Sequence, residues 1–266
     1  MEVYGLLGNP VGHSLSPAMH EAGFEALGID ARYVTFEPES VAEAVQGAAA
    51  LGIGGLNVTI PFKEEALAVV EPDATAFRIG AVNTIDFSSD PPAGHNTDIA
   101  GVRRSFRHHD IDLAGEEAVL VGAGGAGRAV AFALSDGGAT VRIANRTSER
   151  AESLAGELEA ASAHDLAELP ELIAGATILV NATSVGMETD ESVVPKHALH
   201  NELIVMDAVY RPLETRLLAD AAAVGAATID GAWMLLYQGV EAFELWTGES
   251  APVEVMNHTL RDHLAA

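Results

Sequence analysis

A glycine-rich loop directly after a short apolar run constrains this chain more than any other feature. The run Ala118–Val121 is typical of a buried strand, and it leads without a spacer into G-x-G-x-x-G, formed by Gly122, Gly124 and Gly127 at the start of an expected helix. Such glycines permit a tight turn and let the backbone approach a pyrophosphate at the helix N-terminus. The sequence therefore predicts a Rossmann unit in which the loop binds a dinucleotide through Gly122, Ala123, Gly124, Gly125, Ala126 and Gly127. The alternative is a glycine-rich turn without a ligand.

The rest of the chain alternates short apolar runs with amphipathic segments, which is typical of α/β folds with parallel sheets. Ser16 is expected to be the N-cap of a helix that stops at Gly28, and Ser40 to cap one that ends near Leu51. The segment Ser88–Gly94 is expected to be a surface loop. Strands are expected at Val3–Leu7, Tyr33–Phe36, Gly55–Ile60, Val82–Phe87, Ala118–Val121, Val141–Ala144, Ile178–Asn181 and Ile204–Asp207.

Two α/β domains follow from this pattern. Residues 1–98 are predicted to form an open α/β domain that binds substrate and carries the catalytic residues, and residues 99–230 a Rossmann-type domain. The tail, residues 231–266, reads as two helices. We expect these helices to return to the first domain, because neither can bury its apolar face alone.

The end of the second Rossmann strand indicates which dinucleotide binds. Enzymes that use NAD usually place an acidic side chain there for the ribose 2′-hydroxyl. This chain instead has Asn145, Arg146 and Thr147, with Arg150 one helical turn further. A guanidinium can form paired hydrogen bonds with a 2′-phosphate, so NADP(H) is the predicted cofactor. The alternative for Arg146 is a solvated surface arginine.

Three polar clusters are expected at the carboxyl ends of strands, where open parallel sheets bind ligands. The first is Gly8–Pro17, the second Asn57–Lys63, and the third combines Asn83 and Thr84 with Asn96–Asp98. Together they supply hydroxyls, amides, one ammonium and one carboxylate. This set suits a small substrate that bears a carboxylate and several hydroxyl groups.

Lys63 and Asp98 are the candidate catalytic residues in these clusters. Reduction of a ketone requires a hydride donor on one side and a proton donor near the oxygen, and the Lys63 ammonium can donate that proton. Asp98 can bind a substrate hydroxyl and favour the charged lysine. A solvated lysine and an ordinary first-turn acid are the alternatives. Asn181 and Thr183 fit turn residues and cofactor contacts equally well.

Eight motifs in this order resemble the shikimate dehydrogenase family, over residues 5 to 247. They are GNPVGHSLSP, NVTIPFK, GAVNT, GHNTDIAG, GAGGAGRA, NRT, NATSVGM and DGAWMLLYQ. The resemblance implies NADP(H)-linked interconversion of 3-dehydroshikimate and shikimate in aromatic amino acid biosynthesis. It also implies a substrate domain that is completed by the C-terminal helices.

The family roles are carried over at the matching positions. Ser14 and Ser16 match serines that hold the substrate carboxylate, and Lys63 and Asp98 match the catalytic pair. Trp233 and Arg216 stand where the family tends to have glycine and proline, so Trp233 puts the detail of the nicotinamide pocket in doubt. Further matches on the substrate side are Thr59, Asn83, Tyr210 and Gln238, and the nicotinamide side is matched by Ala208 and Gly231.

The charge balance excludes several function classes. The chain has 39 acidic and 14 basic residues, a formal net charge of −25, and no cysteine. Such a surface repels nucleic acid and anionic membranes. The scarcity of lysine in so acidic a chain is typical of proteins from salt-loving organisms. The cations expected near the bound anions are Lys63, Arg128, Arg146 and Arg150.

Further expectations concern location, metals and partners. No segment reads as a transmembrane helix or a signal peptide, so a cytoplasmic location is expected. No metal is expected, because the ten histidines lack a zinc-binding spacing. The expected partners are a small-molecule substrate and a second copy in a homodimer. The competing functions are an NAD-dependent quinate/shikimate dehydrogenase and a non-catalytic NADP-binding redox sensor.

Overall fold

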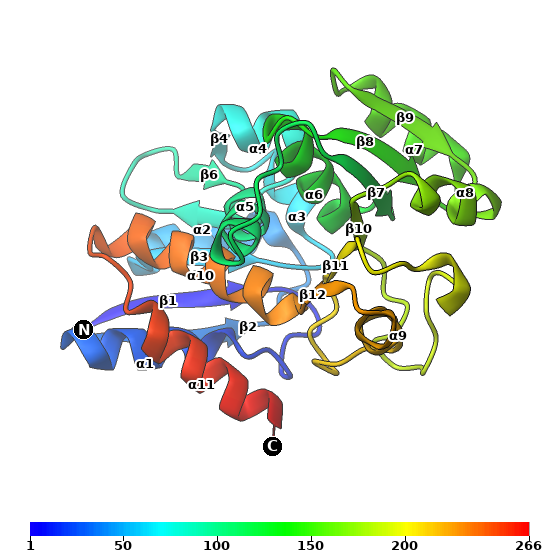
Figure 1. Ribbon diagram of the computed structural model, residues 1–266. Coiled ribbons are helices and arrows are strands. Elements are labelled where there is room, and N and C mark those ends of the chain that lie inside the picture. Colours follow the sequence, from blue (N-terminus) through cyan, green and yellow to red (C-terminus); the bar gives the residue numbers. More distant parts are fainter. Residues whose placement is uncertain (266) are drawn as a thin grey trace. The chain divides into compact units, whose positions relative to one another are not determined.

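The computed structural model describes residues 1–265, which form two compact units (Figure 1). The first unit contains residues 1–97 together with the described residues from Gln238 onward, and the second contains Asp98–Tyr237. The two units are described separately below.

The first unit is built on a mixed six-stranded sheet. Its strand order is β2 (Ala31–Phe36), β1 (Glu2–Leu7), β3 (Gly55–Val58), β5 (Thr84–Asp86), β6 (Ala93–His95) and β4 (Glu71–Pro72). Strand β1 is parallel to β2 and β3, whereas β5 runs antiparallel to both β3 and β6. The helices of this unit are α1 (Ser16–Leu27), α2 (Val41–Leu51), α3 (Lys63–Ala66), α4 (Ala74–Ile79), α11 (Val253–Ala265) and the second half of α10 (Gly231–Thr247).

The antiparallel strand β5 corrects the expectation of parallel strands in this unit. Asn83 and Thr84 lie at the amino end of β5, not at a carboxyl end, and Thr84 pairs with Asn57 of β3. Part of the expected surface loop belongs to the sheet as β6, which pairs with β5. Because β5 is reversed, its amino end lies at the same edge of the sheet as the carboxyl end of β3. The second and third polar clusters therefore still come together.

Helices cover the first sheet through two apolar groups. Leu7, Leu56 and Val58 of the sheet belong to one core cluster with α2, α3 and α4. The second group centres on Tyr4 of β1. Its ring stacks with Phe24 of α1 and Trp246 of α10, at centroid distances of 5.4 and 5.1 Å. Helix α11 packs against α1, and both helices belong to the first unit.

The second unit is a Rossmann sheet in which every strand pair is parallel. The strand order is β12 (Ala227–Ile229), β11 (Ile204–Asp207), β10 (Ile178–Asn181), β7 (Glu117–Val121), β8 (Thr140–Ala144) and β9 (Ala161–His164). This is the doubly wound order, with its switch point between β7 and β10. The helical segments are α5 (Asp98–His108), α6 (Gly125–Asp136), α7 (Ser148–Gly156), α8 (Leu169–Ala174), α9 (Arg216–Val224), the first half of α10, and 3₁₀ turns at Leu166–Glu168 and Lys196–Ala198.

Burial on both faces explains why the Rossmann strands read as continuous apolar runs. In β7, Val119 and Val121 belong to a core cluster with residues of α8 and α9. The alternate residues Ala118 and Leu120 point to the opposite face and are also fully buried. A central strand of a parallel sheet has no solvent face, so no alternation of polar residues appears in its sequence.

Several expected boundaries differ from the structure: Asp98 groups with the second unit, and the expected strands Gly55–Ile60 and Val82–Phe87 are shorter. Helix α10 begins in the second unit, since residues 231–237 group with it rather than with the first. The reason is an aromatic contact: the Trp233 ring lies 3.9 Å from that of His108, and the Tyr237 hydroxyl is 2.9 Å from His108 Nδ1. At α1, Leu15 rather than Ser16 is the N-cap, and no side chain caps the helix.

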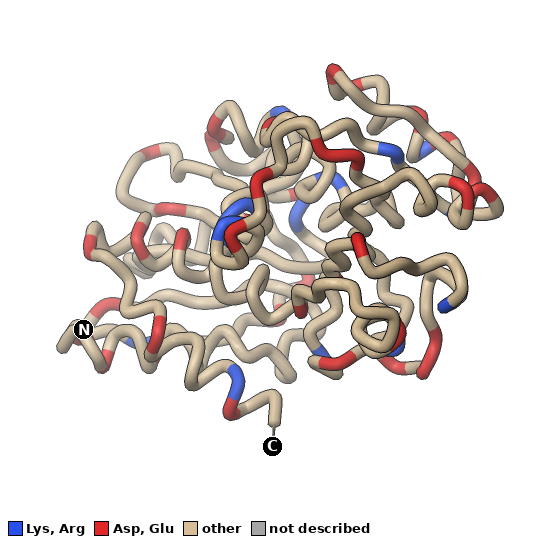
Figure 2. Tube along the Cα trace, in the orientation of Figure 1, with Lys and Arg blue, Asp and Glu red and all other residues tan. Residues whose placement is uncertain are grey.

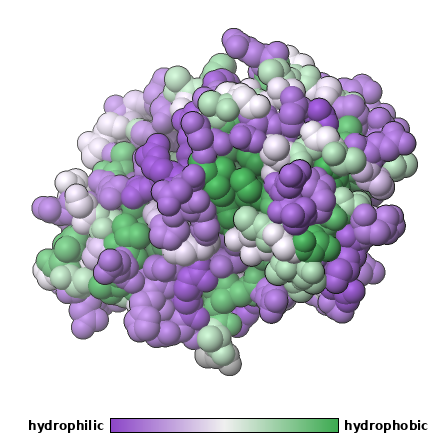
Figure 3. All heavy atoms as spheres, in the orientation of Figure 1, coloured by the Kyte–Doolittle hydropathy of each residue, from purple (hydrophilic) through white to green (hydrophobic). Residues whose placement is uncertain are grey.

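The surface is acidic throughout the chain. Figure 2 shows the acidic residues distributed over many helices, loops and strand ends, with few basic ones between them. Hydrophilic residues dominate the face drawn in Figure 3, and hydrophobic residues appear there in smaller patches. Among residues 1–265, no helix combines the length and the apolar character that crossing a membrane requires.

Candidate functional site

In the first unit, the carboxyl ends of β1 and β3 place the first two polar clusters close together. Asn9 N–H donates to the Ile60 carbonyl at 3.1 Å, and Thr59 N–H donates to the Leu7 carbonyl at 2.8 Å. A Cβ added to Gly8 would meet Thr59 Cγ2 at 2.4 Å, so the loop after β1 lies directly against Thr59. The expected proximity of these two clusters is confirmed.

Ser14 and Ser16 form a small hydroxyl pair at the start of α1. The Ser16 N–H donates to Ser14 Oγ at 3.2 Å, and Ser14 Oγ–H donates to Ser16 Oγ at 3.3 Å. Ser16 is buried and Ser14 is partly exposed. Two adjacent hydroxyls of this kind are suitable donors to a carboxylate.

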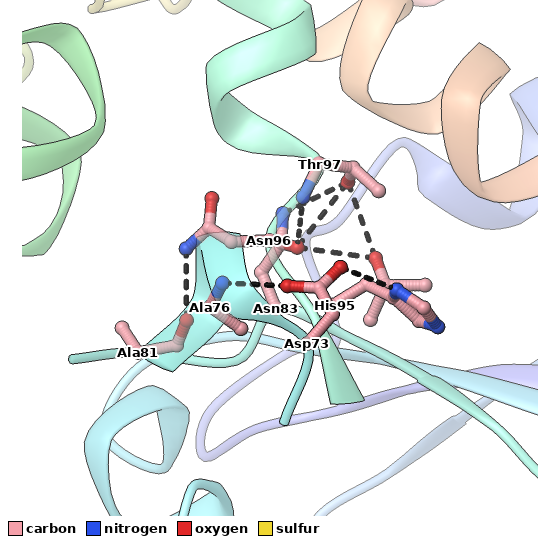
Figure 4. A network of polar contacts seen from close by, with 8 residues as sticks. Asp73, Ala76, Ala81, Asn83, His95, Asn96 and Thr97 are labelled. Atoms are coloured by element: carbon pink, nitrogen blue, oxygen red, sulfur yellow. Dashed lines mark hydrogen bonds and ion pairs between the residues drawn. The ribbon is translucent and has the colours of Figure 1, made fainter. Parts of the chain in front are cut away.

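A buried network of amides and hydroxyls joins β3, β5 and the residues after β6 (Figure 4). Asn83 Oδ1 accepts from the Thr97 N–H at 2.7 Å, while its Nδ2 donates to Thr97 Oγ1 at 3.0 Å. Thr84 Oγ1 lies 3.1 Å from Thr97 Oγ1 and accepts from Asn57 Nδ2 at 3.0 Å. Asn96 Nδ2 donates to the Ala81 carbonyl at 3.0 Å. Asn83, Thr84 and Thr97 of the third cluster are thus joined directly by hydrogen bonds.

The network has one member that the motifs did not identify. Tyr33 of β2 is buried, and its hydroxyl donates to Asn57 Oδ1 at 2.7 Å. Burial raises the pKa of the Tyr33 phenol far above its usual value, so it remains a donor. Only the pairing of β2 with β1 and of β1 with β3 carries this side chain to Asn57, and no local sequence signal reveals it.

A second unexpected contact supports the segment that leads to Asp98. His95 Nδ1 lies 2.7 Å from Asp73 Oδ2, and Asp73 Oδ1 caps α4 by accepting from the Ala76 N–H at 2.7 Å (Figure 4). Because His95 directly precedes Asn96 and Thr97, this contact fixes the start of the polar segment.

The remaining candidates of the first unit lie on helices. Lys63 is the first residue of α3 and is partly exposed, and its carbonyl accepts from the Val82 N–H at 2.8 Å. Gln238 lies in the middle of α10 and is also partly exposed. Both side chains are therefore accessible to solvent or a ligand.

Asp98 is the first residue of the second unit and of α5. Asp98 is buried, with 5% of its surface exposed, and it lies in the first turn of the helix. The partial positive charge at a helix N-terminus stabilises an ionised carboxylate there. Asp98 also follows Thr97 directly, so the network around Asn83 fixes its backbone on one side.

The glycine loop lies at the switch point of the Rossmann sheet. Gly122 has a φ of 110°, and a Cβ there would meet the Ala182 carbonyl oxygen at 2.9 Å. A Cβ on Gly127 would meet the Gly122 carbonyl oxygen at 2.2 Å, so only glycine allows α6 to pack this closely. Gly124 is different, because a Cβ there would meet nothing within 4 Å.

This open space in front of α6 fits a pyrophosphate. Gly124 is the N-cap of α6, and no side chain caps that helix end. The first N–H groups of a helix have no partner within it, and together with the helix dipole they favour a bound anion. Gly124, Gly125 and Ala126 therefore leave room and donors for a phosphate.

The residues after β8 fit a second phosphate. Asn145 Oδ1 accepts from the Ala123 N–H at 3.2 Å, which joins this turn to the glycine loop, and its Nδ2 donates to the Thr147 carbonyl at 2.9 Å. Arg146, Thr147 and Arg150 are all exposed. By contrast Arg128, expected to be available to bound anions, forms a two-pronged salt bridge with Glu157 at 3.0 and 2.7 Å.

The ends of β10 and β11 form a polar network that the motifs only partly revealed. Asp207 is fully buried and accepts from Asn181 Nδ2 at 2.9 Å, Thr215 Oγ1 at 2.7 Å and Val209 N–H at 3.0 Å. Burial raises the pKa of Asp207, and these hydrogen bonds act in the opposite direction. Thr183 Oγ1 donates to Asn181 Oδ1 at 2.7 Å. Of the two roles expected for Asn181 and Thr183, the structure shows that of turn residues.

The expected nicotinamide-side residues lie beyond this network. A Cβ on Gly231 would meet the carbonyl oxygens of Ala208 and Val209 at 2.6 Å, so glycine is required for α10 to start there. Tyr210 is partly exposed, and burial raises the pKa of its phenol. Trp233 packs against both His108 and Tyr237, with its ring centroid 3.9 and 6.0 Å from theirs.

Metal ligands are not clustered in the part of the chain that the structure describes. Among residues 1–265, no group of three or more histidine, aspartate or glutamate side chains is arranged to hold an ion.

Three family models match the chain in sequence order. Residues 6–85 match the shikimate dehydrogenase substrate binding domain, residues 104–219 match shikimate / quinate 5-dehydrogenase, and residues 231–261 match the shikimate 5′-dehydrogenase C-terminal domain. Together these models cover most of the chain.

Curated relatives and solved structures agree with the models. The chain is 66% identical to the shikimate dehydrogenase (NADP(+)) of Natronomonas pharaonis and 65% identical to that of Haloarcula marismortui, in each case over 99% of this chain and 100% of the relative. Among solved structures, it is similar to the shikimate 5-dehydrogenase of Thermus thermophilus in complex with NADP(H) and shikimate. That structure has 40% identity and a TM-score of 0.91, over 99% of this chain and 100% of the other. A quinate dehydrogenase from Corynebacterium glutamicum in complex with NAD has 34% identity and a TM-score of 0.94, over 98% and 99%. From the motifs, the Rossmann unit and these full-length matches, the chain belongs to the shikimate dehydrogenase family.

Proposed function

We propose that this chain is a shikimate dehydrogenase that interconverts 3-dehydroshikimate and shikimate with NADP(H), in aromatic amino acid biosynthesis. The observation that carries this conclusion is the uncapped glycine loop at the Rossmann switch point, followed by exposed arginines where an NAD enzyme usually has a carboxylate. The relatives from Haloarcula marismortui and Natronomonas pharaonis, which share about two thirds of its residues, are both named shikimate dehydrogenase (NADP(+)).

For the cofactor, Gly122–Gly127 would hold the pyrophosphate against the N-terminus of α6. Asn145 and Thr147 shape the turn after β8, and Arg146 and Arg150 would pair with the 2′-phosphate. The lack of a carboxylate at Ala144–Thr147 supports this assignment, because an acid there would repel the phosphate. Ala208 and Gly231 are proposed to line the nicotinamide side.

For the substrate, the hydroxyls of Ser14 and Ser16 are proposed to donate to the carboxylate. Thr59, Asn83, Tyr210 and Gln238 are proposed to bind or orient the ring and its hydroxyl groups. The Asn83 side chain is held in place for this role by its hydrogen bonds with Thr97.

For the reaction, the bound nicotinamide supplies or accepts the hydride. The Lys63 ammonium is proposed to donate a proton to the substrate oxygen when the ketone is reduced, and the amine takes it back in the reverse direction. Asp98 is proposed to accept a hydrogen bond from a substrate hydroxyl. Its place in the first turn of α5, directly after Thr97, supports a carboxylate that is held at a fixed position.

The division of labour between the units is part of this proposal. The unit that contains residues 1–97 would bind substrate, together with the C-terminal helices, and the Rossmann unit would bind NADP(H). The homodimer and the cytoplasmic location stay predictions. Sedimentation in molar KCl tests the first, and fractionation of the source cells tests the second.

A spectrophotometric assay at the NADPH absorbance band tests the proposal. The purified chain is supplied with shikimate or quinate and with NADP⁺ or NAD⁺, in four combinations. We expect the highest kcat/KM with shikimate and NADP⁺. A higher kcat/KM with quinate and NAD⁺ would favour the quinate enzyme, and NADPH binding without turnover in any combination would favour a sensor.

A further inference from the structure

One carboxylate ties down the loop between β1 and α1, which carries Ser14. Glu37 Oε1 accepts two backbone hydrogen bonds from this loop, from the Val11 N–H at 2.7 Å and from the Gly12 N–H at 3.2 Å. Glu37 lies 26 residues away in sequence, so the contact is tertiary and not part of a local turn. No motif that defines the family resemblance includes Glu37.

The sheet brings Glu37 to this loop. Strands β1 and β2 are parallel, and Leu7 at the end of β1 pairs with Phe36 at the end of β2. The Gly8 N–H then donates to the Phe36 carbonyl at 3.1 Å. Glu37 is the next residue, and Pro38 restricts its backbone to an extended conformation. Its side chain therefore starts beside the loop that it binds.

The contact fixes a short turn that ends at the two serines. The Ser14 N–H donates to the Val11 carbonyl at 3.0 Å, and Ser14 Oγ then accepts from the Ser16 N–H at 3.2 Å. The Val11 side chain is buried, and a Cβ on Gly8 would lie 2.6 Å from Val11 Cγ1. The turn is thus anchored in the protein interior by the Val11 side chain and held on its solvent side by Glu37.

The negative charge of Glu37 disfavours substrate binding, but its hydrogen bonds to the loop offset this effect. A negative charge close to a site for a substrate carboxylate disfavours binding, and the chain already has a net charge of −25. A carboxylate nevertheless makes the stronger acceptor for two N–H groups, because a charged partner roughly doubles the strength of such hydrogen bonds. The carboxylate therefore orders the turn more strongly than a neutral acceptor would, although it repels the substrate carboxylate.

We propose that Glu37 is a positioning residue for substrate recognition, which holds the Val11–Ser14 turn so that the hydroxyls of Ser14 and Ser16 are arranged before the substrate carboxylate arrives. The proposal rests on the role assigned to these serines in the proposed function. Loss of Glu37 would leave the turn mobile, and the substrate would then have to order it on binding.

Steady-state kinetics of Glu37→Ala, Glu37→Gln and Glu39→Ala test the proposal. Glu39 is the matched control, because it is an exposed acid two residues further on without a contact to the turn. We expect Glu37→Ala to raise KM for shikimate about tenfold, which corresponds to the loss of roughly one charged hydrogen bond. Both kcat and KM for NADP⁺ should change less than about threefold. Glu37→Gln, whose amide oxygen can accept the same two bonds more weakly, should reverse most of this rise in KM.

Hydrogen exchange of residues 8–16 provides a readout that needs no turnover. It should be faster in Glu37→Ala than in the wild type and in Glu39→Ala. An unchanged KM for shikimate in a folded Glu37→Ala, or an equal rise in both KM values that Glu37→Gln does not reverse, would overturn the positioning role. Absence of wild-type turnover with shikimate would reject the proposed function as well, whereas unchanged exchange would reject the contact itself.

Discussion

His20 of α1 should make the stability of this protein sensitive to mild acid. The residue is 0% exposed, and neither ring nitrogen has a hydrogen-bond partner. Its ring stacks on Tyr33 with centroids 4.5 Å apart and planes 6° apart, and a Cβ on Gly239 would lie 3.4 Å from its Nε2. Burial lowers the pKa of His20 from 6.5 to about 3, because the imidazolium would lose its hydration in this pocket.

The sign and size of the effect follow from linkage. The pKa is depressed in the folded state, so on acidification the unfolded chain takes up the proton first. Stability is therefore full above pH 6.5 and falls as the pH decreases toward 3. Between pH 7.5 and pH 5.0, titration of His20 alone removes about 2 kcal/mol from the free energy of unfolding.

Urea unfolding at constant molar KCl, in the wild type and in His20→Leu, measures this contribution. Other side chains also contribute to the pH dependence, so the difference between the two proteins at each pH is the informative quantity. At pH 7.5 the two should differ little, because the loss of ring stacking opposes the relief of two unsatisfied nitrogens, each effect being about 1 kcal/mol. Between pH 7.5 and pH 5.0, the free energy of unfolding of His20→Leu should rise by about 2 kcal/mol relative to that of the wild type.

His197→Leu is the matched control, since His197 is exposed and should leave the pH slope unchanged. The reasoning is refuted if His20→Leu and the wild type lose stability in parallel between pH 7.5 and 5.0. A resonance of His20 that titrates near pH 6.5 in the folded protein would refute it independently.

Three further outcomes are expected. Lys63→Ala should lower kcat by about 10²–10⁴-fold with little change in KM for shikimate, because general acid catalysis contributes that much. Lys196→Ala, which removes the other lysine, should keep a normal rate, and a kcat within a few-fold of wild type in Lys63→Ala would contradict the role. Arg146→Asp should lower the ratio of kcat/KM for NADP⁺ over NAD⁺ by at least about tenfold, since it replaces a phosphate partner with a repelling charge; an unmoved ratio means that the 2′-phosphate is bound elsewhere. Between 0.1 M and molar KCl, Tm should rise by several degrees, because screening shortens the reach of the repulsion from about 10 Å to about 3 Å; a flat or falling Tm would count against it.

Local sequence patterns predicted the four central strands of the Rossmann unit but missed its edge strands β9 and β12. The strands Ile178–Asn181 and Ile204–Asp207 have the predicted bounds, and β7 and β8 extend theirs by one residue. Strands β7 and β10 are buried on both faces, so their continuous apolar runs reflect their environment directly. The need for glycine at position 127 is equally local, because a Cβ there would meet the Gly122 carbonyl, whereas Gly122 meets Ala182 of a distant segment.

Contacts between distant segments were beyond any local pattern. The carboxylate of Glu37 on the Val11 turn, the Tyr33 hydroxyl on Asn57 and the salt bridge of Arg128 with Glu157 each join residues more than 20 positions apart. Which of several exposed acids or arginines forms such a contact depends on strand order and register. Arg128 and Arg146 look alike in the sequence, yet only Arg128 is committed to a carboxylate.

The sequence by itself determined the family, the Rossmann unit and the polar residues that meet at the edge of the first sheet, because motifs, apolar runs and turn residues are properties of neighbouring positions. The tertiary structure alone decided that β5 is antiparallel, that His20 and Asp207 are buried, and that Glu37 holds the turn before Ser14. The physical reason is that burial and hydrogen-bond partners depend on which strands become neighbours. That choice is made by the packing of a whole sheet against its helices and not by any single segment.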